Sequence, residues 1–90
     1  NLNPEFVLED IFYERPYYYA TARPLYPQAR TYIWRLNGNY KSRAKQPQLQ
    51  FDFVKNEKVI VELTMHLEDY EASSFKELTL EEFKNLKAGE

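Results

Sequence analysis

The alternation of apolar and polar residues in the second half of the chain constrains its fold most strongly. Residues 48–54 (QLQFDFV) and 59–67 (VIVELTMHL) place apolar residues at every second position, and a polar KNEK turn separates them. Side chains alternate between the two faces of a β-strand, so the pattern predicts two strands that each bury one face. We expect them to pair as an antiparallel hairpin. Its buried face would carry Leu49, Phe51, Phe53, Val59, Val61, Leu63 and Met65.

A second hairpin is predicted around Asn37-Gly38, because both residues tolerate the positive φ angles of a tight turn. The preceding segment TYIWRL, residues 31–36, alternates clearly, and the return strand from Tyr40 to about Ala44 is short and basic. Upstream, three consecutive tyrosines favour a strand over residues 17–22. Two prolines follow that strand, and they favour a place at the edge of a sheet.

Two helices are predicted, one at each end of the chain. Near the C-terminus, Thr79 and Glu82 have the spacing of a capping box. A helix of two to three turns is marginal alone, so it should dock its apolar face, Leu80, Phe83 and Leu86, on the sheet. Near the N-terminus, a short helix is expected over residues 3–14, ended by the proline at position 16.

Together these elements predict one small α+β domain over residues 1–90. It would hold an antiparallel sheet of three to five strands, the C-terminal helix packed on one face, and the short N-terminal helix. The segment LEDYEASSFKE, residues 67–77, is interpreted as a polar connection.

Length and composition exclude several classes of protein. The 90 residues include no cysteine, so neither a disulfide nor a thiolate metal site can add stability. No apolar run approaches the roughly 20 residues of a membrane helix, and no signal sequence opens the chain. We therefore expect a soluble cytoplasmic domain without a membrane partner. Because the first residue is Asn1 rather than Met, we also expect the chain to be processed, trimmed or part of something longer.

Few residues have the spacing that catalysis requires. His66 is the single histidine, and we interpret it as a half-exposed residue at a strand end. The acidic HLEDYE segment, residues 66–71, lacks the glycine and ligand spacing of a calcium loop, so it is interpreted as a solvated loop. No serine lies in a glycine elbow, and two glycines are too few for a phosphate-binding loop. We predict no catalytic residue, no metal site and no cofactor, and a protein that is not an enzyme.

The charge distribution gives the strongest functional signal. Seven bases and no acid lie between Arg15 and Lys45, although the chain as a whole has a net charge of −2. The same region holds Trp34 and most of the tyrosines. Tyr, Trp and Arg are enriched in the residues that dominate protein–protein binding energies. We therefore predict a non-enzymatic module that binds another protein, as inhibitors, antitoxins, immunity proteins and modulators do. The predicted contact residues are Arg30, Tyr32, Trp34, Arg35, Tyr40, Lys41, Arg43 and Lys45.

Two alternatives use the same basic and aromatic face. Bases can neutralise phosphates while exposed rings stack on unpaired nucleobases, so the domain could bind single-stranded nucleic acid. The acidic isoelectric point, near 5.5, is unusual for that class. The second alternative is a small RNA-cleaving enzyme of the bacterial toxin–antitoxin type, which also places bases on a small antiparallel sheet. The long N-terminal helical hairpin expected of such toxins is missing here.

Overall fold

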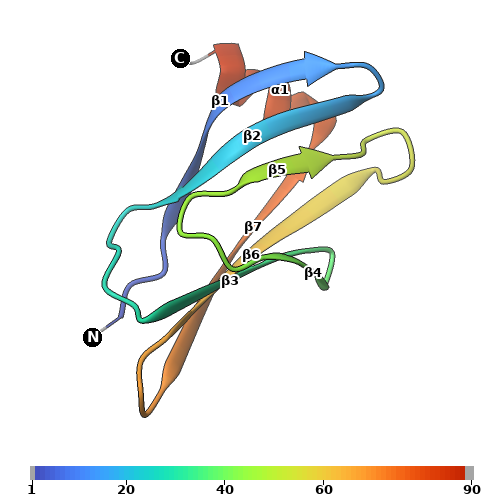
Figure 1. Ribbon diagram of the computed structural model, residues 1–90. Helices are drawn as coiled ribbons and strands as arrows, with labels where there is room; N and C mark the ends of the chain where they lie inside the picture. Colours follow the sequence, from blue (N-terminus) through green and yellow to red (C-terminus); the bar gives the residue numbers. More distant parts are fainter. Residues whose placement is uncertain (1, 89–90) are drawn as a thin grey trace.

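Seven β-strands in two sheets, followed by one short helix, make up the computed structural model, which describes residues 2–88 and the side chains of residues 2–86 (Figure 1). The class is α+β in outline, as expected, but strands dominate and the single predicted sheet is replaced by two. The elements are β1 (Phe6–Glu14), β2 (Tyr17–Pro24), β3 (Thr31–Leu36), β4 (Asn39–Ser42), β5 (Gln48–Phe51), β6 (Lys58–His66), β7 (Glu71–Thr79) and α1 (Leu80–Ala88).

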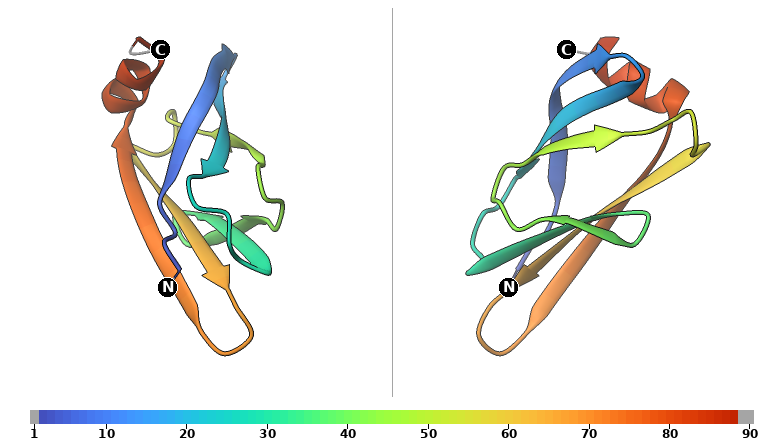
Figure 2. Two further views of the ribbon diagram at one scale, coloured as in Figure 1. Left: turned by 90° about the vertical axis from the view of Figure 1, so that its left-hand side faces the viewer. Right: turned by 45° about the vertical axis from the view of Figure 1, so that its right-hand side comes forward.

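The two sheets form two layers with the core between them (Figure 2). One sheet has the order β1-β2-β5 and the other β4-β3-β6-β7, and all neighbouring strands are antiparallel. The rings of Phe6 on β1 and Trp34 on β3 meet edge to face across the interface, with centroids 5.3 Å apart. Every strand except β4 contributes a buried apolar side chain to this core.

The predicted β5–β6 hairpin is wrong in its pairing, although both strands exist. β5 pairs with β2, and β6 pairs with β3 and β7, so the two strands belong to different sheets. The Asp52 carboxylate accepts backbone N–H bonds from Val54 (3.0 Å) and Lys55 (3.1 Å), which fixes a wide turn between the sheets. Alternation correctly identified the buried face of each strand, apart from Phe53, which is half-buried. Alternation does not identify a strand's neighbour.

The predicted N-terminal helix is also wrong, because that segment forms β1. A bulge lies between Glu9 and Phe12, and Asp10 has a φ of 53°. The extra residue shifts the alternation by one position, so that Leu8 and Ile11 both reach the core. The bulge explains why the sequence shows neither a clean helical stripe nor a clean strand pattern here.

The strand of three tyrosines is not an edge strand, since β2 lies between β1 and β5. Pro24 is tolerated for a specific reason. The Leu25 N–H donates to the Glu5 carbonyl oxygen at 2.9 Å, so the next pair, Phe6 with Pro24, is non-hydrogen-bonded on that side. The proline nitrogen therefore faces the β5 side, where the bonding of β2 ends at Ala22, whose N–H donates to the Pro47 carbonyl oxygen.

β7 occupies most of the segment that was interpreted as a polar connection. Its core-side positions include Ser74 and Lys76, which give no apolar alternation. Both polar groups are accommodated by the N-terminal segment. The Ser74 hydroxyl donates to the Pro4 carbonyl oxygen at 2.6 Å, and the Lys76 ammonium lies 5.5 Å from the centre of the Phe6 ring. These contacts fasten β7 to the start of β1 and close that side of the two layers.

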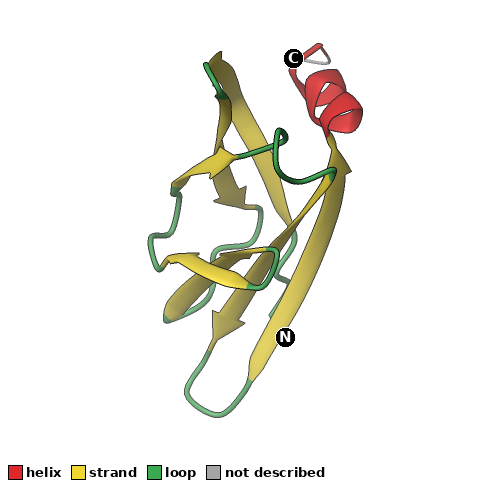
Figure 3. Ribbon diagram, turned by 90° about the vertical axis from the view of Figure 1, so that its right-hand side faces the viewer, coloured by secondary structure: helices red, strands yellow, loops and turns green. Residues whose placement is uncertain are grey.

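Two predicted elements are confirmed by the structure. β3 and β4 form the hairpin at Asn37-Gly38, where φ is 49° and 82°. The C-terminal helix begins with the capping box: the Thr79 N–H donates to Glu82 (2.9 Å), and the Glu82 N–H donates to the Thr79 hydroxyl (3.2 Å). α1 lies at one end of the molecule, opposite the β6–β7 turn (Figure 3), where Phe83 is fully buried while Leu80 and Leu86 are half-buried. Within residues 2–88 no helix is long and apolar enough to cross a membrane.

Candidate binding surface

Three arginines of the acid-free segment are paired with acids from elsewhere in the chain. Arg23 forms two hydrogen bonds with Glu9, at 2.9 and 3.1 Å, on the outer face of the three-stranded sheet. Arg35 pairs with Glu62 at 3.5 Å on the four-stranded sheet, and Arg30, just before β3, pairs with Glu68 in the β6–β7 turn at 3.1 Å. The segment is thus acid-free in sequence but partly neutralised in space.

The pair of Glu9 and Arg23 has the clearest electrostatic effect. The hydrogen bonds from Arg23 hold the pKa of the Glu9 carboxyl below its ordinary value of 4.5, against a smaller opposing effect of desolvation. The same hydrogen bonds raise the pKa of Arg23. These two charges satisfy each other, which makes Arg23 a structural residue rather than a contact for a partner.

Arg35 is similarly occupied within the molecule. Its guanidinium donates to the Thr64 hydroxyl at 3.3 Å in addition to the Glu62 pair. The Thr64 hydroxyl lies 3.2 Å from Glu62 and 2.8 Å from the Ser73 hydroxyl. This network lies on the outer face of the four-stranded sheet, where Arg35 links β3 to β6 and Thr64 extends the network to Ser73 on β7.

Tyr32 and Trp34 are core residues and do not belong to a surface. Their exposed fractions are 8% and 0%, and their positions on β3 point toward the opposing sheet with Leu36. The prediction that they contact a partner is therefore corrected. A strand with one buried face sends half of its rings inward, and these two fall on the inward half.

Four of the five remaining predicted contact residues are exposed on β4 and in the loop that follows it. We call Tyr40, Lys41, Arg43 and Lys45 the β4 cluster; all four are exposed, and Tyr40 by 58%. Among residues 2–86, no carboxylate lies within 4.0 Å of its three cationic groups. These four lie within six consecutive positions of the chain, 40–45. Arg30 is exposed too, but it is paired with Glu68 near the β6–β7 turn.

The loop after β4, which carries Arg43 and Lys45, is held by a hydrogen bond from the buried tryptophan. The Trp34 indole N–H donates to the Ala44 carbonyl oxygen at 2.8 Å. The Ala44 N–H in turn donates to the Ser42 hydroxyl at 3.0 Å. Both backbone groups of Ala44 are therefore fixed, and this residue lies between Arg43 and Lys45.

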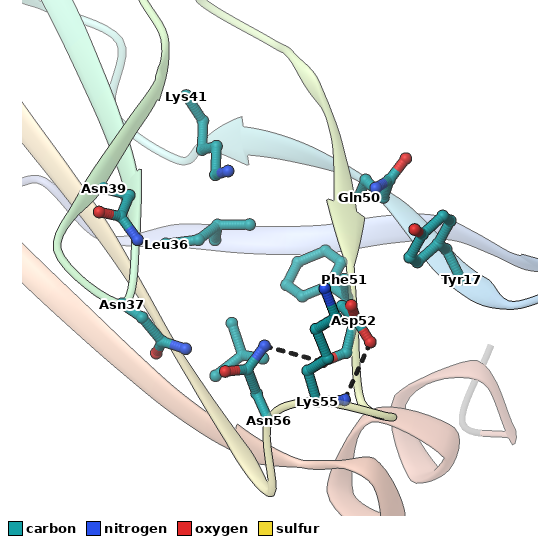
Figure 4. Close-up of a pocket in the computed structure, with 11 residues that line it drawn as sticks. Tyr17, Leu36, Asn37, Asn39, Lys41, Gln50, Phe51, Asp52, Lys55 and Asn56 are labelled. Atoms are coloured by element: carbon teal, nitrogen blue, oxygen red, sulfur yellow. Dashed lines mark hydrogen bonds between the residues drawn. The ribbon is translucent and has the colours of Figure 1, made fainter.

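Beside the β4 cluster, a cleft of about 450 Å³ separates β4 from β5. Figure 4 shows Asn37, Asn39 and Lys41 on one side of the cleft and Tyr17, Gln50 and Asp52 on the other. We call it the inter-sheet cleft. Its full lining is Tyr17, Leu36, Asn37, Asn39, Lys41, Gln50, Phe51, Asp52, Lys55, Asn56 and Val59. Amides and lysines thus surround a few apolar side chains, and the cleft lies on the side of the two layers that the N-terminal segment does not close.

Apart from Lys41, no residue pattern in the sequence predicted this cleft. The cleft exists because β4 and β5 end their sheets side by side without pairing, and the predicted hairpin of β5 with β6 concealed that arrangement. Whether two distant strands pair or leave a cleft between them cannot be recognised from the residues of either strand alone.

The residues considered for catalysis take structural positions. His66 lies 3.7 Å from Glu71 across the β6–β7 pair. Each of the three serine hydroxyls forms a hydrogen bond within the fold. Within the described part of the chain, no group of three potential metal ligands is present.

Comparison of the chain with protein-family models, with curated protein sequences and with solved structures found no match.

Proposed function

We propose that this domain is a non-enzymatic module that binds an acidic surface on another protein through the β4 cluster. One observation carries the proposal. Three arginines of the acid-free segment form ion pairs within the chain. Three further bases, Lys41, Arg43 and Lys45, lie within five residues, and in the described part of the chain no acid forms an ion pair with them. Unpaired charge of one sign on a fixed loop attracts partners of opposite charge and sets the orientation of their approach.

Tyr40 gives the cluster its apolar contact. Its ring lies on the outer face of β4, opposite Arg35 in the register, and is 58% exposed. Tyrosine combines a large rigid ring with a hydroxyl, which suits an interface anchor surrounded by charges. We therefore assign the bases to the attraction and orientation of the partner, and Tyr40 to the contact that slows its dissociation.

Binding of single-stranded nucleic acid is the weaker alternative. Such binding combines bases with a row of exposed rings that stack on successive nucleobases. With Tyr32 and Trp34 buried, Tyr40 is the one aromatic residue of the eight predicted contacts that remains exposed. A single ring beside three cations suits one anchored protein contact better than a stacked strand.

The test is affinity capture from native lysate, with and without nuclease, followed by quantitative mass spectrometry. We expect the wild-type chain to retain a protein in both conditions. The variant Lys41→Glu/Arg43→Glu/Lys45→Glu should lose that protein, because it reverses the charge of the cluster.

The matched control is Arg15→Glu/Lys58→Glu/Lys84→Glu, which changes net charge equally at three exposed positions outside the cluster. It should retain the partner. If the control loses the partner to the same extent, binding depends on total charge and the cluster has no special role. If nuclease abolishes every cluster-dependent capture, the ligand is nucleic acid.

A further inference from the structure

We infer that the inter-sheet cleft binds an extended acidic segment of a protein, which lies as an added strand between β4 and β5. The inference rests on the proposed function and specifies how the partner is recognised. It follows from three features of the cleft: the free backbone edges that border it, the charges that line it and the apolar residues at its base.

The β5 edge offers free backbone groups to the cleft. The Ala22 N–H donates to the Pro47 carbonyl oxygen at 2.9 Å, so these two residues form a hydrogen-bonded pair between the strands. Such pairs alternate in an antiparallel ladder, and the register then places the next ones at Leu49 and Phe51. The N–H and C=O groups of Gln50 therefore point away from β2. β5 is the last strand of its sheet, so these groups face the cleft.

The β4 edge offers the same kind of groups from the other side. In a two-residue hairpin the residues that flank the turn, here Leu36 and Asn39, form a hydrogen-bonded pair. The next pair, Arg35 with Tyr40, is then non-hydrogen-bonded, so the backbone groups of Tyr40 point away from β3. β4 is also the last strand of its sheet. An extended peptide between the two edges would find main-chain partners on both sides, as peptides do when they add to a sheet edge.

The charges in the cleft determine the sign of the peptide. Lys41 lines the cleft from the β4 side and Lys55 from the turn after β5. The one carboxylate in the lining, Asp52, already accepts two backbone N–H bonds within its turn. The β4 cluster continues this positive charge along the chain with Arg43 and Lys45. Acidic side chains on the peptide are therefore favoured and basic ones disfavoured.

The residues at the base of the cleft determine which side chains of the peptide can point inward. Leu36, Phe51 and Val59 lie beneath the cleft and are almost fully buried, so they offer only a small apolar patch, which suits a small inward side chain, while Asn39 and Asn56 supply amides. Because a strand alternates its side chains, an inward apolar residue and an outward acid can repeat along one segment. The occupant is thus an extended segment that alternates acidic and apolar residues.

The direct test uses a capped peptide that alternates glutamate with valine, titrated into the ¹⁵N-labelled domain and followed by NMR. We expect the largest changes in amide chemical shift at Asn39, Tyr40, Gln50 and Asn56. A peptide that alternates lysine with valine should not bind. Methylation of the peptide nitrogens along one edge should weaken binding about tenfold, because it removes main-chain donors without changing the domain.

Two variants separate backbone recognition from side-chain recognition. Gln50→Pro removes the outward N–H while sparing the bonds to β2, and should weaken peptide binding about tenfold. Gln50→Ala keeps that N–H and should bind like the wild type. The double variant Lys41→Glu/Lys55→Glu should reverse the preference and bind the lysine peptide. Shifts outside the cleft, equal binding of both peptides, or an unchanged affinity after N-methylation would overturn the inference.

Its failure is distinguishable from failure of the proposed function. If the β4-cluster variant loses a captured protein while Gln50→Pro retains it, the domain binds a protein but not through the cleft, and the inference is wrong. If the glutamate peptide binds the cleft as described, the inference holds, even where nuclease abolishes every cluster-dependent capture from lysate.

Discussion

The indole N–H of Trp34 donates a 2.8 Å hydrogen bond to the carbonyl oxygen of Ala44, which links a fully buried side chain to the exposed loop of the β4 cluster. We predict that Trp34→Phe destabilises the domain by about 1–3 kcal/mol, because the hydrogen bond is lost and the smaller ring leaves a cavity. It should also weaken partner binding, since the loop loses its anchor. Chemical denaturation measures the loss of stability, a binding titration with the captured partner measures the loss of affinity, and the amide exchange rate of Ala44 reports the order of the loop.

Ser42→Ala is the matched variant for this anchor. It removes the acceptor of the Ala44 N–H but leaves the core intact. We expect faster exchange at Ala44 with little loss of global stability. If exchange at Ala44 is faster in Ser42→Ala but unchanged in Trp34→Phe, the tryptophan does not position the loop.

Local patterns in the sequence were sufficient to predict the strands that bury alternating apolar residues and the elements whose ends carry a turn or capping signal. The Asn37-Gly38 turn and the Thr79–Glu82 capping box are examples, because each depends on residues that are adjacent or three apart. The strand β7 could not be found in this way. Its polar inward residue Ser74 is satisfied by Pro4, which is 70 positions away in the chain.

The candidate binding surface was likewise predictable only in part. Lys41 and the other bases of the β4 cluster were predicted from charge, and they remain exposed. The roles of Arg35 and Trp34 were not predictable, because they depend on Glu62 across the sheet and on the opposing layer. Burial and ion pairing depend on residues that are distant in the chain, and one sequence does not show which of these residues become neighbours in the fold.

The aromatic cluster around α1 should be a main source of stability. Phe83 is fully buried, and its ring lies 4.7 Å from Phe51, 5.4 Å from Phe53 and 5.6 Å from Tyr18, centre to centre. Phe83→Ala should cost about 3–5 kcal/mol, a large fraction of the stability of a small domain. Phe75→Ala is the control, since that ring is 65% exposed. Equal melting temperatures for the two variants would contradict the structure.

The capping box predicts a smaller effect at the start of α1. Thr79→Ala should cost about 0.5–2 kcal/mol in the free energy of unfolding, because the Glu82 N–H loses its acceptor. Glu82→Gln keeps an acceptor for the Thr79 N–H and should be closer to neutral. Denaturant titrations of both variants measure the difference, and a neutral Thr79→Ala would place the helix start elsewhere.

The ion pair of Glu9 with Arg23 predicts a dependence of stability on pH. The folded pKa of Glu9 lies below its ordinary value of 4.5, so its contribution is present above that pH and is lost as the pH falls through the folded value. Glu9→Gln should flatten the stability curve below pH 4.5, because the variant has no proton to take up there. A slope identical to that of the wild type in this range would show that the pair is not formed in solution.

The last prediction separates the two classes of ligand by salt. If nucleic acid binds, each phosphate neutralised by Lys41, Arg43 or Lys45 releases a counterion. The affinity for a single-stranded oligonucleotide should then fall with a log–log slope of about −0.7 per contact, or about −2 for the three bases. Tyr40→Ala would leave that slope unchanged, because the ring contributes no charge.

If a protein binds, as we propose, binding should survive nuclease and moderate salt. Tyr40→Ala should then reduce affinity more than the loss of any single base, mainly through faster dissociation. Surface plasmon resonance at several salt concentrations measures both quantities. Salt-sensitive micromolar binding of a random oligonucleotide to the pure domain would decide against the protein partner.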